Sequence, residues 1–292
     1  MDKNIGYRIL SLGLKVGLGI ALCVGAARAQ DVPQGLSQSD IYCSGLVTNQ
    51  AVPTDTYIIS GENSDYKNTF IPGDYVYINR GGSQGVKVGD LFQVMRPVHD
   101  AAKSQWFKYQ HQLYRAMGTT YADIGELQVV HVQDKTATAE LKMSCDLMQR
   151  GDIVRPFVTR PIPSFHNTKL DIFAAPSGKK TGMVVTTKNF GMASGTGRIV
   201  YVNLGSAQGV KEGDYFRVFR YQGSHNSTLY QPRGTAYKAY GFGSTPIAYQ
   251  WDQLPRQILG EGIVLRTSPN ASTVLLTTVR DAVFVGDYVE LE

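Results

Sequence analysis

The sequence predicts an all-β protein: two tandem small β-barrel or sandwich domains that come from an internal duplication. The first observation behind this prediction is a long segment that occurs twice. The second is a set of glycine-rich turns between short strand-like segments. The third is the composition, with 31 Gly and 17 Tyr among 292 residues, which suits turn-rich β structure better than helical structure.

The repeat is visible as two blocks. Residues 75–96 and 199–220 share 13 of 22 amino acids at an offset of 124 residues. Residues 125–154 match residues 260–289 at an offset of 135. The eleven-residue difference between the offsets indicates an insertion between the blocks of the second copy. Self-similarity of this kind predicts two copies of one structural unit.

The repeat also sets the expected domain boundaries. We expect a signal peptide at 1–29, a first β repeat domain at 30–157, a Pro-rich linker at 158–180 and a second β repeat domain at 181–292. Prolines crowd the end of the first copy and the linker, at positions 156, 161, 163 and 176. No regular element tolerates that density of proline. The similarity between the segments at 44–47 and 181–184 suggests that each copy begins there.

Within each copy the strand segments carry a core pattern. Phe92 and Val94 recur as Phe216 and Val218, two residues apart in an apolar segment. Residues two apart share one face of a strand, so this face is expected to point into the core.

The segment before each of these strands reads G-x-x-x-G-V-x-x-G-D. Its glycines lie at positions 81, 85 and 89 in the first copy and at 205, 209 and 213 in the second. This spacing predicts a compact turn with several residues of positive φ.

One short helix is expected in the first copy. Between residues 100 and 117, apolar and aromatic side chains recur at the helical spacing: Trp106, Tyr109, Leu113 and Met117. The matching segment of the second copy has no such pattern.

The N-terminus has the three parts of a secretory signal. Basic residues precede an apolar segment at 16–26, and Ala27-Arg28-Ala29 follows as a cleavage site. The apolar segment is too short to span a bilayer, so we expect no transmembrane span after cleavage. The expected location is the periplasm or cell envelope. An uncleaved anchor and a lipoprotein attached at Cys23 are the alternatives. The lipoprotein is disfavoured because the signal of a lipoprotein usually has a small residue before the cysteine, and Leu22 is bulky.

Removing the signal changes the charge. The whole chain carries +5 and residues 1–29 carry +3, which leaves +2 for the mature protein. A balance this small gives no basis for nucleic acid binding. Two cysteines remain, Cys43 and Cys145. In an oxidising compartment they are expected to form a disulfide, with two buried thiols as the alternative.

Catalytic motifs are present only in unsuitable contexts. G-x-S-x-G at 81–85 is followed by another strand, where a nucleophile elbow needs a helix. The S-x-x-K motif at 177–180 overlaps its K-T-G partner. The histidines (99, 111, 131, 166 and 225) do not pair at metal-ligand spacing. We therefore expect a non-enzyme without cofactor or metal.

The turn segment at 203–214, NLGSAQGVKEGD, resembles a turn of bacterial envelope β-barrel domains. Those domains are the C-terminal domain of flagellar assembly protein T and the β domain of the rod-shape protein MreC. The segment at 254–261, LPRQILGE, resembles the C-terminal domains of some LysM-containing envelope proteins. The resemblance implies scaffolding or assembly in the envelope through protein contacts.

The long connections at 97–124 and 221–259 are the expected binding surface. Loops of this length are usually functional or disordered, and Tyr mixed with Gly and Ser makes an adaptable contact surface. The candidate residues of this surface are Trp106, Tyr109, Tyr230, Tyr237, Tyr240, Phe242, Tyr249 and Trp251. The alternative is that these aromatic side chains cap the open ends of their own barrels.

The favoured function is an exported, non-catalytic envelope scaffold or assembly module that contacts envelope proteins, including copies of itself. The alternative is a peptidoglycan- or carbohydrate-binding module that stacks loop aromatics on sugar rings. An enzyme of unrecognised type is the third option. It would require a cleft in which acidic side chains converge.

Overall fold

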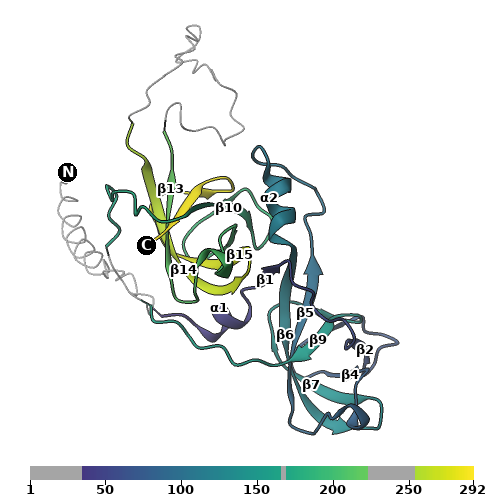
Figure 1. Cartoon of the computed structure of the whole chain (residues 1–292). Coiled ribbons are helices and arrows are strands. Elements are labelled where there is room, and N and C mark those ends of the chain that lie inside the picture. Colours follow the sequence, from purple (N-terminus) through teal and green to yellow (C-terminus); the bar gives the residue numbers. More distant parts are fainter. Residues whose placement is uncertain (1–34, 166–168, 223–253) are drawn as a thin grey trace, which may run out of the picture. The chain divides into compact units, whose positions relative to one another are not determined.

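A computed structural model describes residues 35–165, 169–222 and 254–292 (Figure 1). Strands and their connections make up most of this part of the chain, and its two α-helices are short: α1 (Gln38–Tyr42) and α2 (Gln110–Met117). The all-β prediction is confirmed. Within the described ranges, no helix is long and apolar enough to cross a membrane. The expected signal peptide lies outside the described residues.

The first repeat is built on a seven-stranded sheet. Its strands follow the order β2 (Ile58–Gly61), β4 (Tyr75–Ile78), β7 (Ala137–Ser144), β6 (Thr119–Val132), β5 (Leu91–Val98) and β9 (Ile153–Pro156). Strand β1 (Leu46–Thr48) pairs with the beginning of β6. A bridge between Tyr57 and Ile153 connects the two ends of the sheet. A small separate pair is formed by β3 (Thr69–Phe70) and β8 (Met148–Gln149).

The second repeat is a closed barrel, coloured green to yellow in Figure 1. Its strands follow the order β10 (Thr181–Thr187), β12 (Ile199–Val202), β15 (Ala271–Val279), β14 (Gln257–Ser268), β13 (Tyr215–Arg220) and β17 (Tyr288–Leu291). A small separate pair is again present, formed by β11 (Ala193–Ser194) and β16 (Val283–Phe284). The six barrel strands therefore follow the same order as the six strands from β2 to β9 in the first repeat, which has β1 in addition.

The predicted correspondence between residues 44–47 and 181–184 is wrong, although 181–184 do lie in β10, the first strand of the barrel. The segment at 44–47 leads into β1, which pairs with β6 and has no counterpart in the barrel. The strand that corresponds to β10 is β2. The side-chain oxygen of Asn79 accepts a hydrogen bond from the Tyr57 amide at 2.7 Å, and that of Asn203 accepts one from the Met183 amide at 2.6 Å. A repeated asparagine thus holds the first strand of each copy.

The repeated glycines have two different roles. Gly85 and Gly209 have φ of 84° and 91°, as the turn prediction requires. Gly81 has an ordinary φ of −136°, but a Cβ there would lie 2.4 Å from the carbonyl oxygen of Gln133. This glycine is therefore required by the close approach of two chain segments rather than by its own φ. The turn itself contains a short 3₁₀ helix in each copy, η1 (Gly82–Gln84) and η2 (Ser206–Gln208).

The predicted core face is confirmed. Phe92 and Val94 lie in the core of the first repeat, together with residues such as Ile58, Ile78 and Leu127. Phe216 and Val218 lie in the core of the second repeat. Each repeat has its own interior of Val, Leu, Ile and Phe side chains, and burial of this apolar surface is the main source of its stability.

The helix predicted at 100–117 is shorter than expected. It begins at Gln110 because the preceding residue, Tyr109, has a left-handed φ of 72°. Before that point, the Asp100 carboxylate accepts hydrogen bonds from the amides of Ala102 and Ser104, which holds a turn. Trp106 and Tyr109 therefore lie in the connection that precedes α2, and only the last two residues of the predicted apolar face belong to the helix.

Candidate partner-binding surfaces

The connection between β5 and β6 contacts the second repeat. The Gln110 side chain of α2 donates a hydrogen bond to the Val185 carbonyl on β10 at 2.9 Å. Phe107 is fully buried, and its ring lies so close to Gly286 that a Cβ there would be 3.2 Å away. The first repeat thus covers part of the barrel wall of the second, which the sequence did not predict.

An apolar cluster lies beneath α2. Met117 packs with Val185, Tyr201 and Ala271 of the second repeat and with Val47 of β1. All five side chains are almost completely buried. On the neighbouring wall of the barrel, Ile41 of α1 packs against a second apolar group made of Tyr215, Ile263, Leu265 and Leu275. The outer wall of the second repeat is therefore covered at two places by elements from the N-terminal half of the chain.

The predicted aromatic surface is only partly within the described residues. Trp106 is half-buried, and its amide donates to the Gln110 side-chain oxygen at 2.7 Å. Tyr109 is 53% exposed, and the Lys108 amino group lies 4.8 Å from its ring centre. The remaining candidates lie outside the described residues: Tyr230, Tyr237, Tyr240, Phe242, Tyr249 and Trp251. The binding role of this set stays a prediction.

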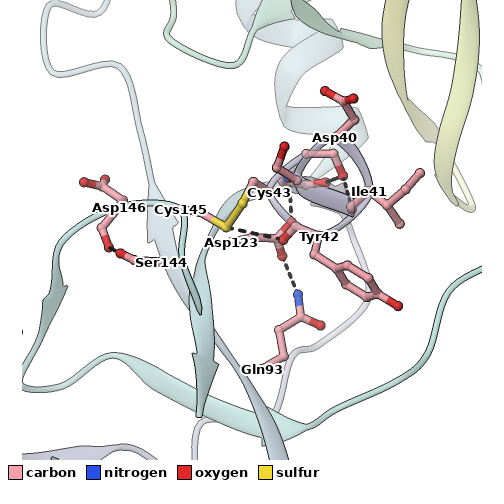
Figure 2. The surroundings of a disulfide bond; sticks show 12 residues. Asp40, Ile41, Tyr42, Cys43, Gln93, Asp123, Ser144, Cys145 and Asp146 are labelled. Atoms are coloured by element: carbon pink, nitrogen blue, oxygen red, sulfur yellow. Dashed lines mark hydrogen bonds between the residues drawn. A yellow bond between two sulfur atoms is a disulfide. The ribbon is translucent and has the colours of Figure 1, made fainter. Parts of the chain in front are cut away.

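The predicted disulfide involves Cys43, the residue directly after α1. The Cα atoms of Cys43 and Cys145 lie 5.4 Å apart, and their sulfur atoms are bonded (Figure 2). Cys145 directly follows β7, so this bond ties the N-terminal helix to the sheet of the first repeat. Because α1 also packs on the barrel, the helix is held from both sides.

A buried carboxylate lies beside the disulfide. Asp123 of β6 accepts hydrogen bonds from the Gly45 amide at 2.8 Å and from the Gln93 side chain, as Figure 2 shows for Gln93. Arg266 of β14 completes this group with an ion pair at 3.2 Å. The Asp123 side chain is fully buried, so its charge needs these partners. The pair joins a strand of the first repeat to a strand of the second.

Arg160 lies in the same region. Burial and the neighbouring Arg266 lower its pKa to about 10. Its guanidinium donates to the Ile41 carbonyl at 2.7 Å and lies 4.8 Å from the centre of the Tyr42 ring. These contacts attach the segment after β9 to α1. The two cations of this region therefore contact carbonyl oxygens, an aromatic ring and Asp123.

Each repeat also contains the same Arg–Asp pair, in which the aspartate is buried and the arginine is partly exposed. Arg96 binds both carboxylate oxygens of Asp152, at 2.6 and 2.8 Å. Arg220 binds both oxygens of Asp287, each at 2.7 Å. The hydrogen bond that Arg96 donates to Asp152 raises the pKa of Arg96. The same carboxylates accept hydrogen bonds from the backbone amides of Gln149 and Phe284. These contacts hold the turn before the last strand of each repeat.

Glu290 of β17 lies between two arginines. Burial by itself raises its pKa, but hydrogen bonds from Arg256, the Ser177 amide and Arg217 bring it below the ordinary 4.5. A lowered folded-state pKa stabilises the protein above the unfolded pKa, and this contribution is lost as the pH falls through the folded value.

We expect the Glu290→Gln substitution to make the free energy of unfolding depend less on pH in the acidic range. The variant should be less stable than the parent at neutral pH, and the difference should shrink as the pH falls below the ordinary pKa of 4.5 and Glu290 of the parent takes up its proton. Denaturant unfolding at a series of pH values measures this. Equal losses at all pH values would show that the Glu290 charge is not the cause.

A groove of about 780 Å³ lies between α1 and the loops around β11. Lys188, Arg198 and Arg280 contribute cations to its lining, and Asp40 and Asp281 contribute acids. The Lys188 amino group donates to the Cys43 carbonyl at 2.6 Å, which closes one side of the groove. In the described ranges, no cluster of three His, Cys, Asp or Glu side chains could hold a metal ion.

The first repeat exposes apolar side chains on its outer face. On and beside β2 and β4, Tyr57 and Ile59 are each 42% exposed and Tyr75 is 37% exposed. Together with the half-buried Tyr77, these residues form what we call the β2–β4 wall. Large apolar side chains grouped on one face are typical of protein contact sites.

A known protein family matches part of the chain. The model of the flagellar assembly protein T C-terminal domain matches residues 73–156, which is the first repeat from just before β4 to the end of β9. The expected resemblance to the C-terminal domain of flagellar assembly protein T is therefore confirmed for the first repeat. No curated protein matches the chain.

Proposed function

We propose that the chain is an exported, non-catalytic assembly module of the cell envelope that acts by binding other proteins. The observation that carries this proposal is the match of the first repeat to a domain of a flagellar assembly protein. The apparent signal sequence at 1–29 supports export. The proposal includes cleavage after residue 29, repeat domains at 30–157 and 181–292, and a linker at 158–180.

The contacts within the structure support a binding role over catalysis. The repeated polar residues of both copies serve turns and buried ion pairs: Asn79 and Asn203, Asp90 and Asp214, and the two Arg–Asp pairs. A binding module instead needs an exposed, partly apolar surface, and the β2–β4 wall is such a surface.

Photo-crosslinking in living cells tests the proposal. Tyr75 is replaced by the photoreactive phenylalanine derivative benzoylphenylalanine, which keeps an aromatic side chain at an exposed site. We expect specific protein adducts from this position. The matched control is the same replacement at Val88, which is 66% exposed and lies in the turn after η1. Equal, weak adduct formation at both positions would contradict a protein-binding wall.

The glycan alternative has a separate test. Purified mature protein, residues 30–292, is sedimented with isolated peptidoglycan sacculi. We expect the protein to stay in the supernatant at physiological salt. Saturable binding that is lost when Tyr109 is changed to Ala would place the glycan-binding function first, because stacking on sugar rings requires an exposed aromatic ring.

A further inference from the structure

The two repeats share their topology but differ in what covers their outer walls. Val185 and Ile59 occupy the same place in the two copies, each at a bulge in the first strand. Val185 is fully buried beneath α2, whereas Ile59 is 42% exposed. Both side chains are apolar, so the first repeat exposes a surface that the second repeat buries.

A glycine pair shows the same difference. Gly286 and Gly151 lie at the corresponding turns before β17 and β9. The Phe107 ring covers Gly286, with atoms 3.2 Å from a Cβ built there. At Gly151 a built Cβ would meet no atom within 4 Å among the described residues. The site that receives Phe107 in the second repeat is therefore open in the first.

The covering element has a counterpart in the second repeat. Phe107 and α2 belong to the connection between β5 and β6. The corresponding connection joins β13 to β14, and the part of it at 223–253 lies outside the described residues. In sequence, this segment is rich in Tyr, with one Phe and one Trp. Those residue types provide large contact areas at protein interfaces.

We propose that the β2–β4 wall is the docking site for a second copy of this chain, and that residues 223–253 of that copy occupy it. The occupant would cover Ile59 and Gly151 as α2 and Phe107 cover Val185 and Gly286 within one chain. This inference rests on the proposed assembly function and names its partner. Because each copy offers one wall and one connection, the contact is head-to-tail and extends to a ring or a filament.

The exposure of the wall leaves it available to a second molecule. The contact that buries Val185 does not bury Ile59, so it does not cover both repeats of one chain at once. Ile59 is 42% exposed although α2 lies on the second repeat, so the described contact runs in one direction. If each connection covers the repeat that follows it, the β13–β14 connection of one molecule covers the first repeat of the next molecule.

Analytical ultracentrifugation of the mature protein tests the docking site. We expect the average mass of the parent protein to rise with concentration. Ile59→Glu should weaken this association by about tenfold or more, since the carboxylate would be buried in the contact. Val88→Glu is the matched control. Val88 is 66% exposed, and the second repeat of the same chain carries Glu212 at the corresponding position. The control should associate like the parent.

A mixing experiment tests the direction of the contact. In one variant, a short Gly-Ser turn replaces residues 223–253, which is feasible because Arg220 and Gln257 are paired neighbours. This variant keeps the wall, and Ile59→Glu keeps the connection. Neither should associate alone, and an equal mixture should form heterodimers. Circular dichroism confirms that both variants are folded.

A parent protein that stays monomeric at every concentration, or a mixture without heterodimers, overturns the docking proposal. In that case, crosslinking from Tyr75 to a different envelope protein would leave the proposed function standing. An absence of both self-association and protein crosslinks would overturn the two together.

Discussion

Replacing both Cys43 and Cys145 by alanine is expected to lower the free energy of unfolding by about 4–5 kcal/mol. The disulfide joins residues 102 positions apart, so it removes much of the freedom of the unfolded chain. In the folded protein, the same bond holds the end of α1 against the first repeat. Denaturant unfolding of the parent and the double variant measures the difference.

The reduced parent protein is the control for this experiment. Reduction breaks the same bond without changing any side chain volume, so it should reproduce most of the loss. A change of less than about 1 kcal/mol in both cases would show that the packing of Ile41 and the contacts of Arg160 hold α1 without the disulfide.

Replacing Asp123 by alanine is expected to cost about 3–5 kcal/mol of stability. The substitution leaves the Arg266 guanidinium, whose side chain is only 14% exposed, without its carboxylate. It also removes the acceptor of the Gly45 amide at 2.8 Å. Asp123→Asn keeps an oxygen acceptor but not the charge, so the stability of this variant should lie between those of the parent and of Asp123→Ala. Denaturant unfolding of the three proteins measures the order.

A matched control separates this effect from charge removal in general. Asp55 pairs with Arg155 at 3.5 Å, but its side chain is 65% exposed. Asp55→Ala should therefore cost less than about 1 kcal/mol, because water screens exposed ion pairs. Similar losses at Asp55 and Asp123 would contradict the account in which the buried Asp123–Arg266 pair joins the two repeats.

The features that the sequence predicted well are those that local pattern controls. The duplicated block placed Phe92, Val94 and their counterparts in the two cores. The G-x-x-x-G spacing predicted positive φ at Gly85 and Gly209. In these cases the conformation of a few neighbouring residues decides which side chains are buried and which residues have positive φ. The local pattern of residue types indicates that conformation directly.

The features that the sequence missed depend on distant contacts. The short helix α1 has a local signal, the Ser37–Asp40 capping box, but five residues give no helical period to recognise. The pairing of Asp123 with Arg266 joins positions far apart in the chain, and one sequence contains no signal for it. The burial of Phe107 on Gly286 is of the same kind, since the exposed Tyr109 nearby is also aromatic and residue type does not distinguish the two.

The most direct test of the assembly function is photo-crosslinking from Tyr75 in living cells, compared with Val88 under the same illumination. The account predicts a distinct protein adduct at Tyr75, identified by mass spectrometry, which is absent at Val88. Peptides from the 223–253 segment in that adduct would identify a second copy of the chain as the partner. An absence of any protein adduct specific to Tyr75 would contradict the claim that this face of the first repeat binds proteins.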